Sequence, residues 1–163
     1  MSEDRSERPN HVPWPPLLLG GSALAAVSCD VLAVLPEELH LPHHTLLRGM
    51  GLVLGVAGGA FIVWAIGLMM QTRSNILPNQ AATRLLKTGP FGWSRNPIYF
   101  GEVIVFAGIA LFTTNPVYLI AGLLLALSVH HLGIRREEAH MAARFGSDWS
   151  AYCARVPRWF GPF

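Results

Sequence analysis

Residues 97–134 read PIYFGEVIVFAGIALFTTNPVYLIAGLLLALSVHHLGI, and this stretch decides the fold. It contains two apolar runs, about 97–113 and 116–134, joined by the turn residues Thr113-Thr114-Asn115-Pro116. A helix needs roughly 20 apolar residues to cross a bilayer core, and both runs approach that length. Because their connection is so short, we expect them to form a tight antiparallel helical hairpin.

The composition of the whole chain also indicates a membrane protein. Of its 163 residues, 52% are hydrophobic and only 13% are charged, whereas soluble domains carry about 25% charged residues. The mean hydropathy is +0.38. The net charge of +2 gives no indication of nucleic-acid binding, and the two cysteines form no CxxC motif. The length suits one domain.

Two more apolar runs precede the hairpin, at about 14–35 and 46–70. We therefore predict an all-α membrane protein with about four transmembrane helices, in which residues 14–163 form a single domain. The mixed-charge residues 1–13 are expected to be disordered and cytoplasmic. We expect no cleavable signal peptide, because the apolar run that follows them lacks a convincing cleavage site.

The basic residues predict the orientation. With four spans, eleven of the twelve Lys and Arg residues fall on one side of the membrane, and Arg48 alone lies on the other. Lys and Arg concentrate on the cytoplasmic side of membrane proteins. We therefore predict a multi-pass protein in which both termini and the polar segments face the cytoplasm.

The second predicted span carries glycines at four-residue steps, Gly51, Gly55 and Gly59. Glycines repeated in this way form a helix face that another helix can approach closely. This face either packs within the bundle or forms a homodimer interface.

The segment 89–102, GPFGWSRNPIYFGE, leads into the third predicted span. Asn96 is a favoured helix N-cap and Pro97 suits the first helical position, so this helix should begin there. Its free backbone N–H groups would be ready to receive a carboxylate or a phosphate. Tyr99 and Glu102 share one face of the helix. Glu102 either lines a wet pocket among the helices or lies near enough to the boundary to reach water.

A second polar cluster, Arg135-Arg136-Glu137-Glu138, stands where the fourth predicted span ends. A charge run of this kind is commonly a solvated helix end with internal ion pairs. The hairpin, however, brings it out beside residues 95–99, and two unusual clusters on one face favour a functional site. Ser147 can cap a further short helix that starts at Asp148, and the aromatic residues of this C-terminal helix suit the membrane interface.

Histidines cluster in two other places. Three histidines, His40, His43 and His44, lie in the loop of residues 37–44 together with glutamates. Histidine and carboxylate side chains are suitable zinc ligands. The loop is short, broken by proline and on the opposite face, so we predict no metal site. His130 and His131, near the end of the fourth predicted span, are expected to pack or to line a pocket.

Two segments in this order, GPFGWSRNPIYFGE at 89–102 and REEAHMAARFGSDWSAYCARVPRWF at 136–160, resemble the isoprenylcysteine carboxyl methyltransferase and phospholipid methyltransferase superfamily. The shared pattern has Gly-Pro-aromatic, then Arg-Asn-Pro-x-Tyr at a helix start. A Glu-Glu pair follows one hairpin later, then Phe-Gly and Arg-Val-Pro. Members are integral-membrane enzymes that use S-adenosyl-L-methionine, and the match covers about residues 73–160.

The resemblance implies that the cofactor is held by two segments, 73–99 and 133–160. The contact residues in them would be Thr83, Arg84, Leu85, Leu86, Phe91, Asn96, Pro97, Ile98, Tyr99 and Glu137. Asn96 stands where many members have histidine, and Phe91 stands where others have tyrosine. No Gly-rich nucleotide fingerprint of the soluble type follows a strand here.

The resemblance also implies where the methyl acceptor binds. Arg135 or Arg136 would lie near it and would hold a carboxylate. A thiol or amine acceptor would need a base, for which Glu102, Glu138 and His131 are candidates. We expect an isoprenylcysteine-carboxyl-methyltransferase-like enzyme. Phospholipid N-methylation and thiol S-methylation are alternatives, and a small membrane scaffold built on the glycine face is the non-enzymatic one.

Overall fold

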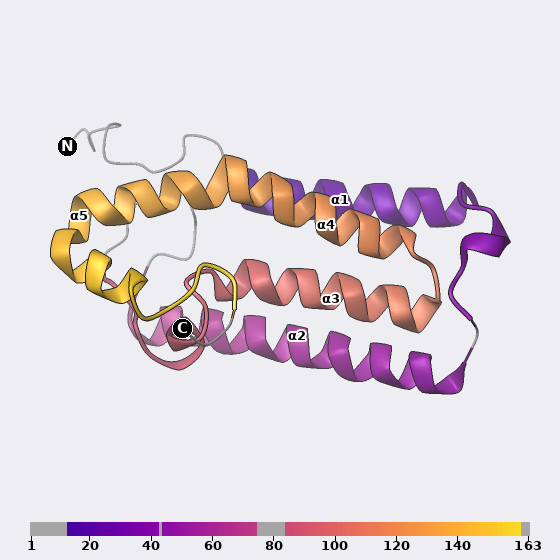
Figure 1. The fold of residues 1–163 in the computed structure, drawn as a ribbon, viewed down its shortest axis with the longest axis horizontal. Helices are drawn as coiled ribbons and strands as arrows, with labels where there is room; N and C mark the ends of the chain where they lie inside the picture. Colours follow the sequence, from indigo (N-terminus) through magenta and orange to yellow (C-terminus); the bar gives the residue numbers. More distant parts are fainter. Residues whose placement is uncertain (1–12, 43, 75–83, 161–163) are drawn as a thin grey trace.

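The computed structural model describes residues 13–42, 44–74 and 84–160, and all regular structure in these residues is helical. This confirms the predicted all-α fold. The bundle consists of α1 (Trp14–Val31), α2 (Thr45–Gln71), α3 (Pro97–Thr113) and α4 (Val117–Val129). The packing pairs are α2 with α3, α3 with α4, and α4 with α1, so the helices follow that order across the bundle (Figure 1).

The helix boundaries lie close to the predicted spans. Helix α3 covers the predicted residues 97–113, and α2 exceeds its predicted span of 46–70 by one residue at each end. Helix α1 ends at Val31, earlier than predicted, because the chain turns there and Ala33 adopts a left-handed φ of 46°. The predicted disorder at the N-terminus concerns residues 1–13, of which 1–12 lie outside the described part of the chain.

The fourth predicted span continues into a much longer rod. Helix α4 passes through a π-helix, η4 (His130–Ile134), directly into α5 (Arg135–Cys153). The whole stretch Val117–Cys153 has 37 residues, which corresponds to about 55 Å of helix, whereas a bilayer core is about 30 Å thick. The stretch is therefore longer, along its path, than a bilayer core is thick, and its last part, α5, carries the Glu137–Glu138 pair.

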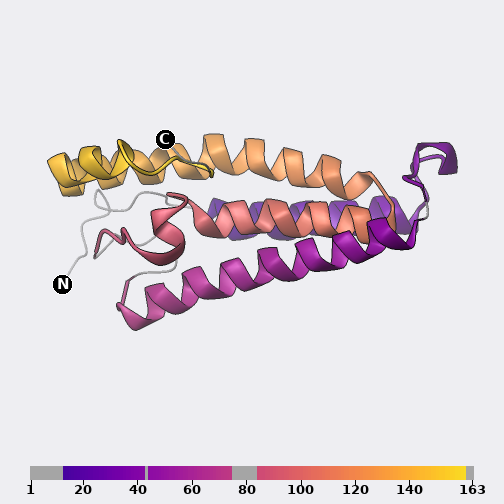
Figure 2. The same cartoon turned by 60° about the horizontal axis from the view of Figure 1, so that its bottom comes forward.

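Helix α5 bends back toward the start of α3. Gly146 departs from helical geometry, with φ 50° and ψ −119°, and the helix resumes after it next to the predicted cap Ser147. The bend directs the last turns of α5 and the chain beyond Cys153 toward the N-terminal end of α3 (Figures 1 and 2). The glycine is required there because its positive φ is strained for residues with a side chain.

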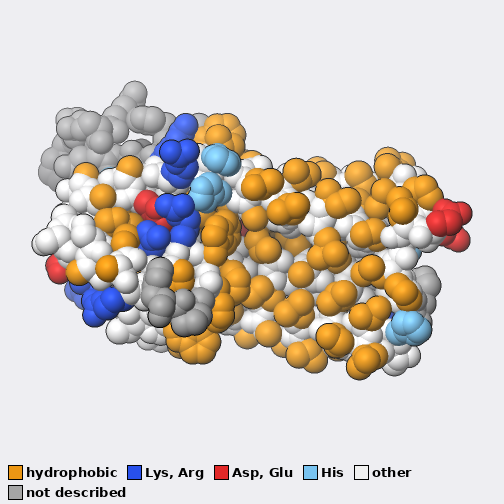
Figure 3. Space-filling model, viewed as in Figure 1, with side chains coloured by type: hydrophobic (Ala, Val, Ile, Leu, Met, Phe, Trp, Pro, Cys, Tyr) orange, Lys and Arg blue, Asp and Glu red, His pale blue; other side chains and the backbone are white. Residues whose placement is uncertain are grey.

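Two stretches of the described chain are long and apolar enough to cross a membrane. They are α2 and the rod that begins with α4, while α3 is a shorter apolar helix. On the face that Figure 3 shows, apolar side chains cover most of the bundle, and Lys and Arg side chains gather at the α5 end. Val53, for example, is 70% exposed and Leu123 is 61% exposed. Such a surface fits lipid better than water. The number of spans and their orientation remain predictions.

The glycine face of α2 packs against α3. A methyl group on Gly51 or Gly58 would collide with α3, and one on Gly108 of α3 would lie 2.7 Å from the Cα atom of Gly55. A side chain at Gly59 would meet nothing within 4 Å. A side chain at Gly55 would also meet nothing, although its backbone lies against Gly108. The close face thus runs from Gly51 to Gly58 past the Gly55 backbone, rather than to Gly59, and its packing is within the chain. The homodimer through Gly51, Gly55 and Gly59 remains a prediction.

A polar cluster ties α1 to the far end of the hairpin. The carboxylate of Asp30 accepts hydrogen bonds from Asn115 Nδ2 at 2.6 Å and from the Tyr118 hydroxyl at 2.8 Å. Asn115 also accepts the backbone N–H of Val117 at 3.0 Å, which caps the start of α4. The tight turn is thereby fixed to α1 at the end opposite α5.

Candidate functional site

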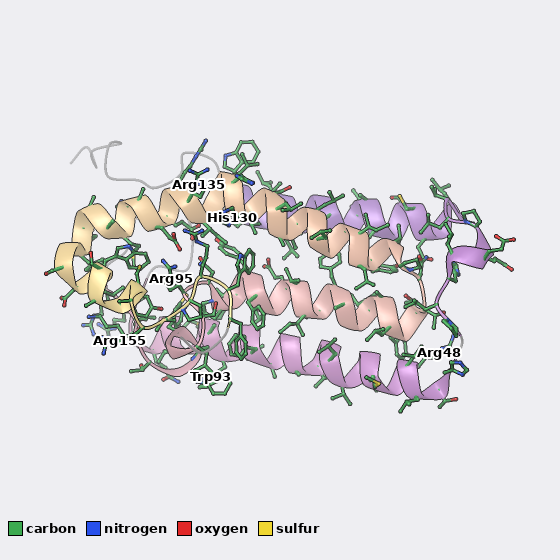
Figure 4. The ribbon with its side chains drawn as sticks, in the orientation of Figure 1. Arg48, Trp93, Arg95, His130, Arg135 and Arg155 are labelled. Carbon is green, nitrogen blue, oxygen red and sulfur yellow. The ribbon has the colours of Figure 1, made fainter. Side chains whose placement is uncertain are left out.

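Three segments meet at the α5 end of the bundle. They are the short 3₁₀ helix η3 (Gly89–Gly92) with the start of α3, the helix α5, and the tail that follows Cys153. The predicted hairpin accounts for this meeting, because α3 begins and α4 ends at the same end of the molecule. Figure 4 shows Arg95 inside this junction, whereas Arg135 points away from the bundle and Arg48 lies at the opposite end.

Glu138 is the centre of the junction. Its carboxylate accepts two hydrogen bonds from Arg158, from Nε at 3.0 Å and from Nη2 at 2.6 Å. Arg95 Nη1 lies 3.0 Å from the Oε1 atom of Glu138. The Arg95 and Glu138 side chains are each 14% exposed. The one carboxylate therefore connects α5, the segment before α3 and the tail, and we refer to these three residues as the Glu138 clamp.

Glu137 faces the first turn of α3. The Tyr99 hydroxyl donates a hydrogen bond to its Oε1 atom at 2.9 Å. Burial raises the pKa of the Glu137 carboxyl to about 7. The Tyr99 hydrogen bond opposes this increase, and the charge on Glu138 adds to it. A carboxylate that titrates near neutral pH inside a polar junction is typical of functional sites.

The N-terminus of α3 lacks the side-chain cap that the sequence predicts. Asn96 does occupy the N-cap position before Pro97, but its side chain makes no capping hydrogen bond. Its amide Nδ2 instead donates to the Arg158 carbonyl at 3.1 Å, and its backbone N–H donates to Ser94 Oγ at 3.0 Å. The tail thus holds the Asn96 amide, and among the described residues no side chain caps the first backbone N–H groups of α3.

The tail is fixed over this region by further contacts. The backbone N–H of Arg95 donates to the Pro157 carbonyl at 2.9 Å, and the Tyr152 hydroxyl donates to the Phe91 carbonyl at 2.6 Å. Arg95 also lies over the ring of Trp149, 5.8 Å from its centroid. These contacts hold the last turns of α5 and the tail against the segment before α3.

The structure brings together part of the predicted residue set. Phe91, Asn96, Tyr99, Glu137 and Glu138 are joined by the contacts above, and Pro97 and Ile98 begin α3 beside them. The other predicted residues take part in none of these contacts. Arg84, Arg135 and Arg136 are exposed, Leu86 is half-buried, and Leu85 packs on the cluster formed by Trp149, Tyr152 and Val156. Thr83 lies outside the described residues. The roles assigned to all of these residues remain predictions.

Sequence reasoning expected Arg95 beside the second cluster but gave it no role, and it missed Arg158 and Tyr152 as members of the junction. A signal for the arginines was present, because Arg95 directly precedes Asn96-Pro97 and Arg158 directly follows Val156-Pro157. Both stand in the quoted segments at 89–102 and 136–160. Only the bend at Gly146, however, brings Tyr152 and Arg158 onto the first segment.

Glu102 lies deeper, one turn after Tyr99. It is buried, with an exposed fraction of 9%, and its Oε2 atom has no hydrogen-bond partner in the part of the chain that the structure describes. That Glu102 lines a pocket remains a prediction.

Comparison with known proteins relates the chain to one family and to two curated proteins. The family model for phospholipid methyltransferase matches residues 47–148, which is more than half of the chain. The chain is 32% identical over 85 residues to Delta(14)-sterol reductase LBR of Gallus gallus, covering 50% of this chain and 13% of that protein. It is 24% identical over 110 residues to the nickel-cobalt-cadmium resistance protein NccN of Alcaligenes xylosoxydans xylosoxydans, covering 64% of this chain and 51% of that protein. The chain thus spans about half or less of the length of these curated relatives.

Proposed function

Because the chain belongs to the phospholipid methyltransferase family, we propose that it is a membrane enzyme that transfers a methyl group from S-adenosyl-L-methionine to a lipophilic or small acceptor. The observation that carries this proposal is the junction between the start of α3, α5 and the tail. It places an uncapped helix N-terminus beside a partly engaged carboxylate, Glu137, at the end of an apolar bundle.

The residues at the junction fit the polar groups of this cofactor. The open N–H groups at the N-terminus of α3 suit its carboxylate, because a helix N-terminus favours anions. Glu137 uses Oε1 for the Tyr99 hydroxyl, which leaves Oε2 to accept from an amino or hydroxyl group. Phe91, Trp93 and Tyr99 offer aromatic faces for the adenine ring or for a cationic sulfur.

When bound, the cofactor would supply an activated methyl group on a sulfonium sulfur, so the protein contributes orientation and exclusion of water. The Glu138 clamp suits that role. It holds the tail over the start of α3 and presents no free acid or base of its own, because both of its carboxylate oxygens are engaged by arginines. We therefore infer that Glu138, which the sequence suggested as a catalytic residue, acts by holding the site together.

We further propose that the protein spans the membrane several times with the junction on the cytoplasmic side. The distribution of Lys and Arg along the sequence supports this orientation. A site at the boundary would admit the polar cofactor from the cytoplasm and a lipophilic acceptor sideways between the helices. This places α5 and the tail at the headgroup level, where Trp159 and Phe160 suit the interface.

Three acceptor chemistries belong to this proposal. An isoprenylcysteine-type carboxylate is the expectation from the sequence, and a phospholipid amine and a thiol are the alternatives. The direct test is incubation of the purified chain with methyl-labelled cofactor and host membranes, followed by identification of the labelled product. A labelled lipid or small molecule supports the proposal, whereas the absence of any label transfer contradicts it.

The activities named for the two curated relatives are not proposed for this chain. The match to this chain covers only 13% of the length of the sterol reductase and 51% of the length of the metal-resistance protein. Within the described residues, no group of three or more His, Cys, Asp or Glu side chains is placed to hold a metal ion. The junction residues instead match the needs of a zwitterionic cofactor.

A further inference from the structure

Glu102 is a buried ionisable side chain that the proposed cofactor site leaves unused. It lies within α3, and its Oε2 atom has no hydrogen-bond partner among the described residues. Among the described residues it takes part in no ion pair, since the described pairs involve only Glu138 and Asp148 as acids. Burial of a carboxylate without a partner is strongly unfavourable. An ionisable residue at such a depth in a membrane protein is therefore expected to serve a function.

The position of Glu102 sets what it can reach. Phe106, one turn further along α3, packs against Gly122 of α4. Residues four apart share a helix face, so Glu102 turns toward α4, while its neighbour Gly101 faces α2. At about 1.5 Å per residue, Glu102 lies roughly 4–5 Å deeper along α3 than Tyr99. It therefore stands between the polar junction and the apolar interior of the bundle.

The other groups suggested for the acceptor are engaged or lie elsewhere. Glu138 is bound by two arginines. Arg135 and Arg136, which would hold a carboxylate acceptor, are exposed, as is His131. A buried carboxylate oxygen without a donor is what remains next to the junction. It would repel a carboxylate acceptor and attract a group that carries a proton.

We propose that Glu102 is the proton acceptor in methyl transfer, and that the acceptor therefore attacks through an atom that bears a proton, the nitrogen of an amine or the sulfur of a thiol. This inference rests on the proposed function. In the step, the acceptor atom forms a bond to the methyl carbon. The bond between that carbon and the sulfonium sulfur breaks, and its electron pair stays on the sulfur. The acceptor proton passes to Oε2 of Glu102.

The test uses three probes with the same twelve-carbon chain: dodecylamine, dodecanethiol and dodecanoic acid. The wild-type chain is purified in detergent and compared with Glu102→Gln and with the control Glu38→Gln, which alters an exposed glutamate at the other end of the molecule. Binding of S-adenosylhomocysteine and of dodecylamine is measured by thermal stabilisation. Methyl transfer from labelled cofactor is measured for each probe.

We expect the wild type and Glu38→Gln to methylate the amine or the thiol in preference to the acid. Glu102→Gln should keep its stabilisation by S-adenosylhomocysteine and lose its stabilisation by dodecylamine. Its transfer rate should fall by at least about 100-fold, the usual contribution of a general base. Glu102→Asp retains a carboxylate and should recover part of the rate.

Either of two results would overturn this inference alone. In the first, Glu102→Gln binds dodecylamine and transfers methyl groups at the rate of the wild type. In the second, the wild type binds S-adenosylhomocysteine but methylates only the acid or none of the probes. The preference of the wild type among the probes decides the matter even where a variant does not fold. Failure of the wild type to bind S-adenosylhomocysteine would instead overturn the proposed function, and this inference with it.

Discussion

Replacement of Glu138 by glutamine should destabilise the protein as a whole rather than remove one chemical step. The carboxylate receives two hydrogen bonds from Arg158 and lies 3.0 Å from Arg95. Glutamine has nearly the same shape but carries no charge, so Glu138→Gln leaves two guanidinium groups facing each other without a counter-ion. One of them, Arg95, has a side chain that is only 14% exposed.

Removal of one partner from a buried charged pair typically costs about 3–5 kcal/mol. The Arg158 side chain is 36% exposed, and solvent screening reduces its share, so we expect a loss of about 2–3 kcal/mol. For chains of this size, 1 kcal/mol corresponds to roughly 2–4 °C in the unfolding midpoint. Glu138→Gln should therefore unfold about 4–12 °C below the wild type.

The measurement is thermal unfolding of the purified chains in one detergent, followed by intrinsic tryptophan fluorescence. Glu37→Gln is the matched control, because Glu37 is exposed in the loop at the opposite end and should change the midpoint by no more than about 1–2 °C. If Glu138→Gln unfolded together with this control while its methyl transfer was lost, Glu138 would be a catalytic residue and the structural role of the clamp would be refuted.

Three further predictions concern packing, the far end of the hairpin and pH. Gly108→Ala should destabilise the chain by about 1–3 kcal/mol, because the new methyl group meets the backbone of α2; Gly59→Ala, with open space, is the control, and equal unfolding midpoints would contradict the close packing. Asp30→Ala leaves the Tyr118 hydroxyl without its acceptor and should cost about 1–3 kcal/mol in the same assay, whereas an unchanged midpoint would show that this cluster is dispensable. Burial raises the pKa of Glu137 from 4.5 to about 7, so the stability that its protonated form provides is complete below pH 4.5 and is lost as the pH rises through 7. The wild type should lose up to about 3 kcal/mol over that window, and Glu137→Gln should flatten the profile; parallel profiles would count against the burial of this charge.

The hairpin and the helix boundaries could be predicted because hydropathy and turn chemistry are local. The turn at residues 113–116 fixes α3 and α4 as antiparallel neighbours, and the predicted third span coincides with α3. The same logic placed Glu137 near Tyr99, 38 residues away in the sequence, and the hydrogen bond between them confirms that proximity.

Other features depend on contacts that no local pattern encodes. The side chain of Asn96 donates a hydrogen bond to the tail instead of capping α3, because the bend at Gly146 brings the Arg158 carbonyl within hydrogen-bond distance. The clamp itself depends on the same bend. The glycine face turns to Gly58 rather than Gly59, because steps of four residues overshoot a 3.6-residue turn and drift away from one face.

The central claim is that this membrane protein binds S-adenosyl-L-methionine at the junction between α3 and α5. Isothermal titration of the purified chain with S-adenosylhomocysteine tests it most directly, with Glu137→Gln titrated alongside. We predict saturable binding by the wild type and at least a tenfold weaker affinity for the variant, whose unfolding should remain cooperative. Absence of binding by the wild type would contradict the claim, and equal affinities would remove Glu137 from the cofactor site.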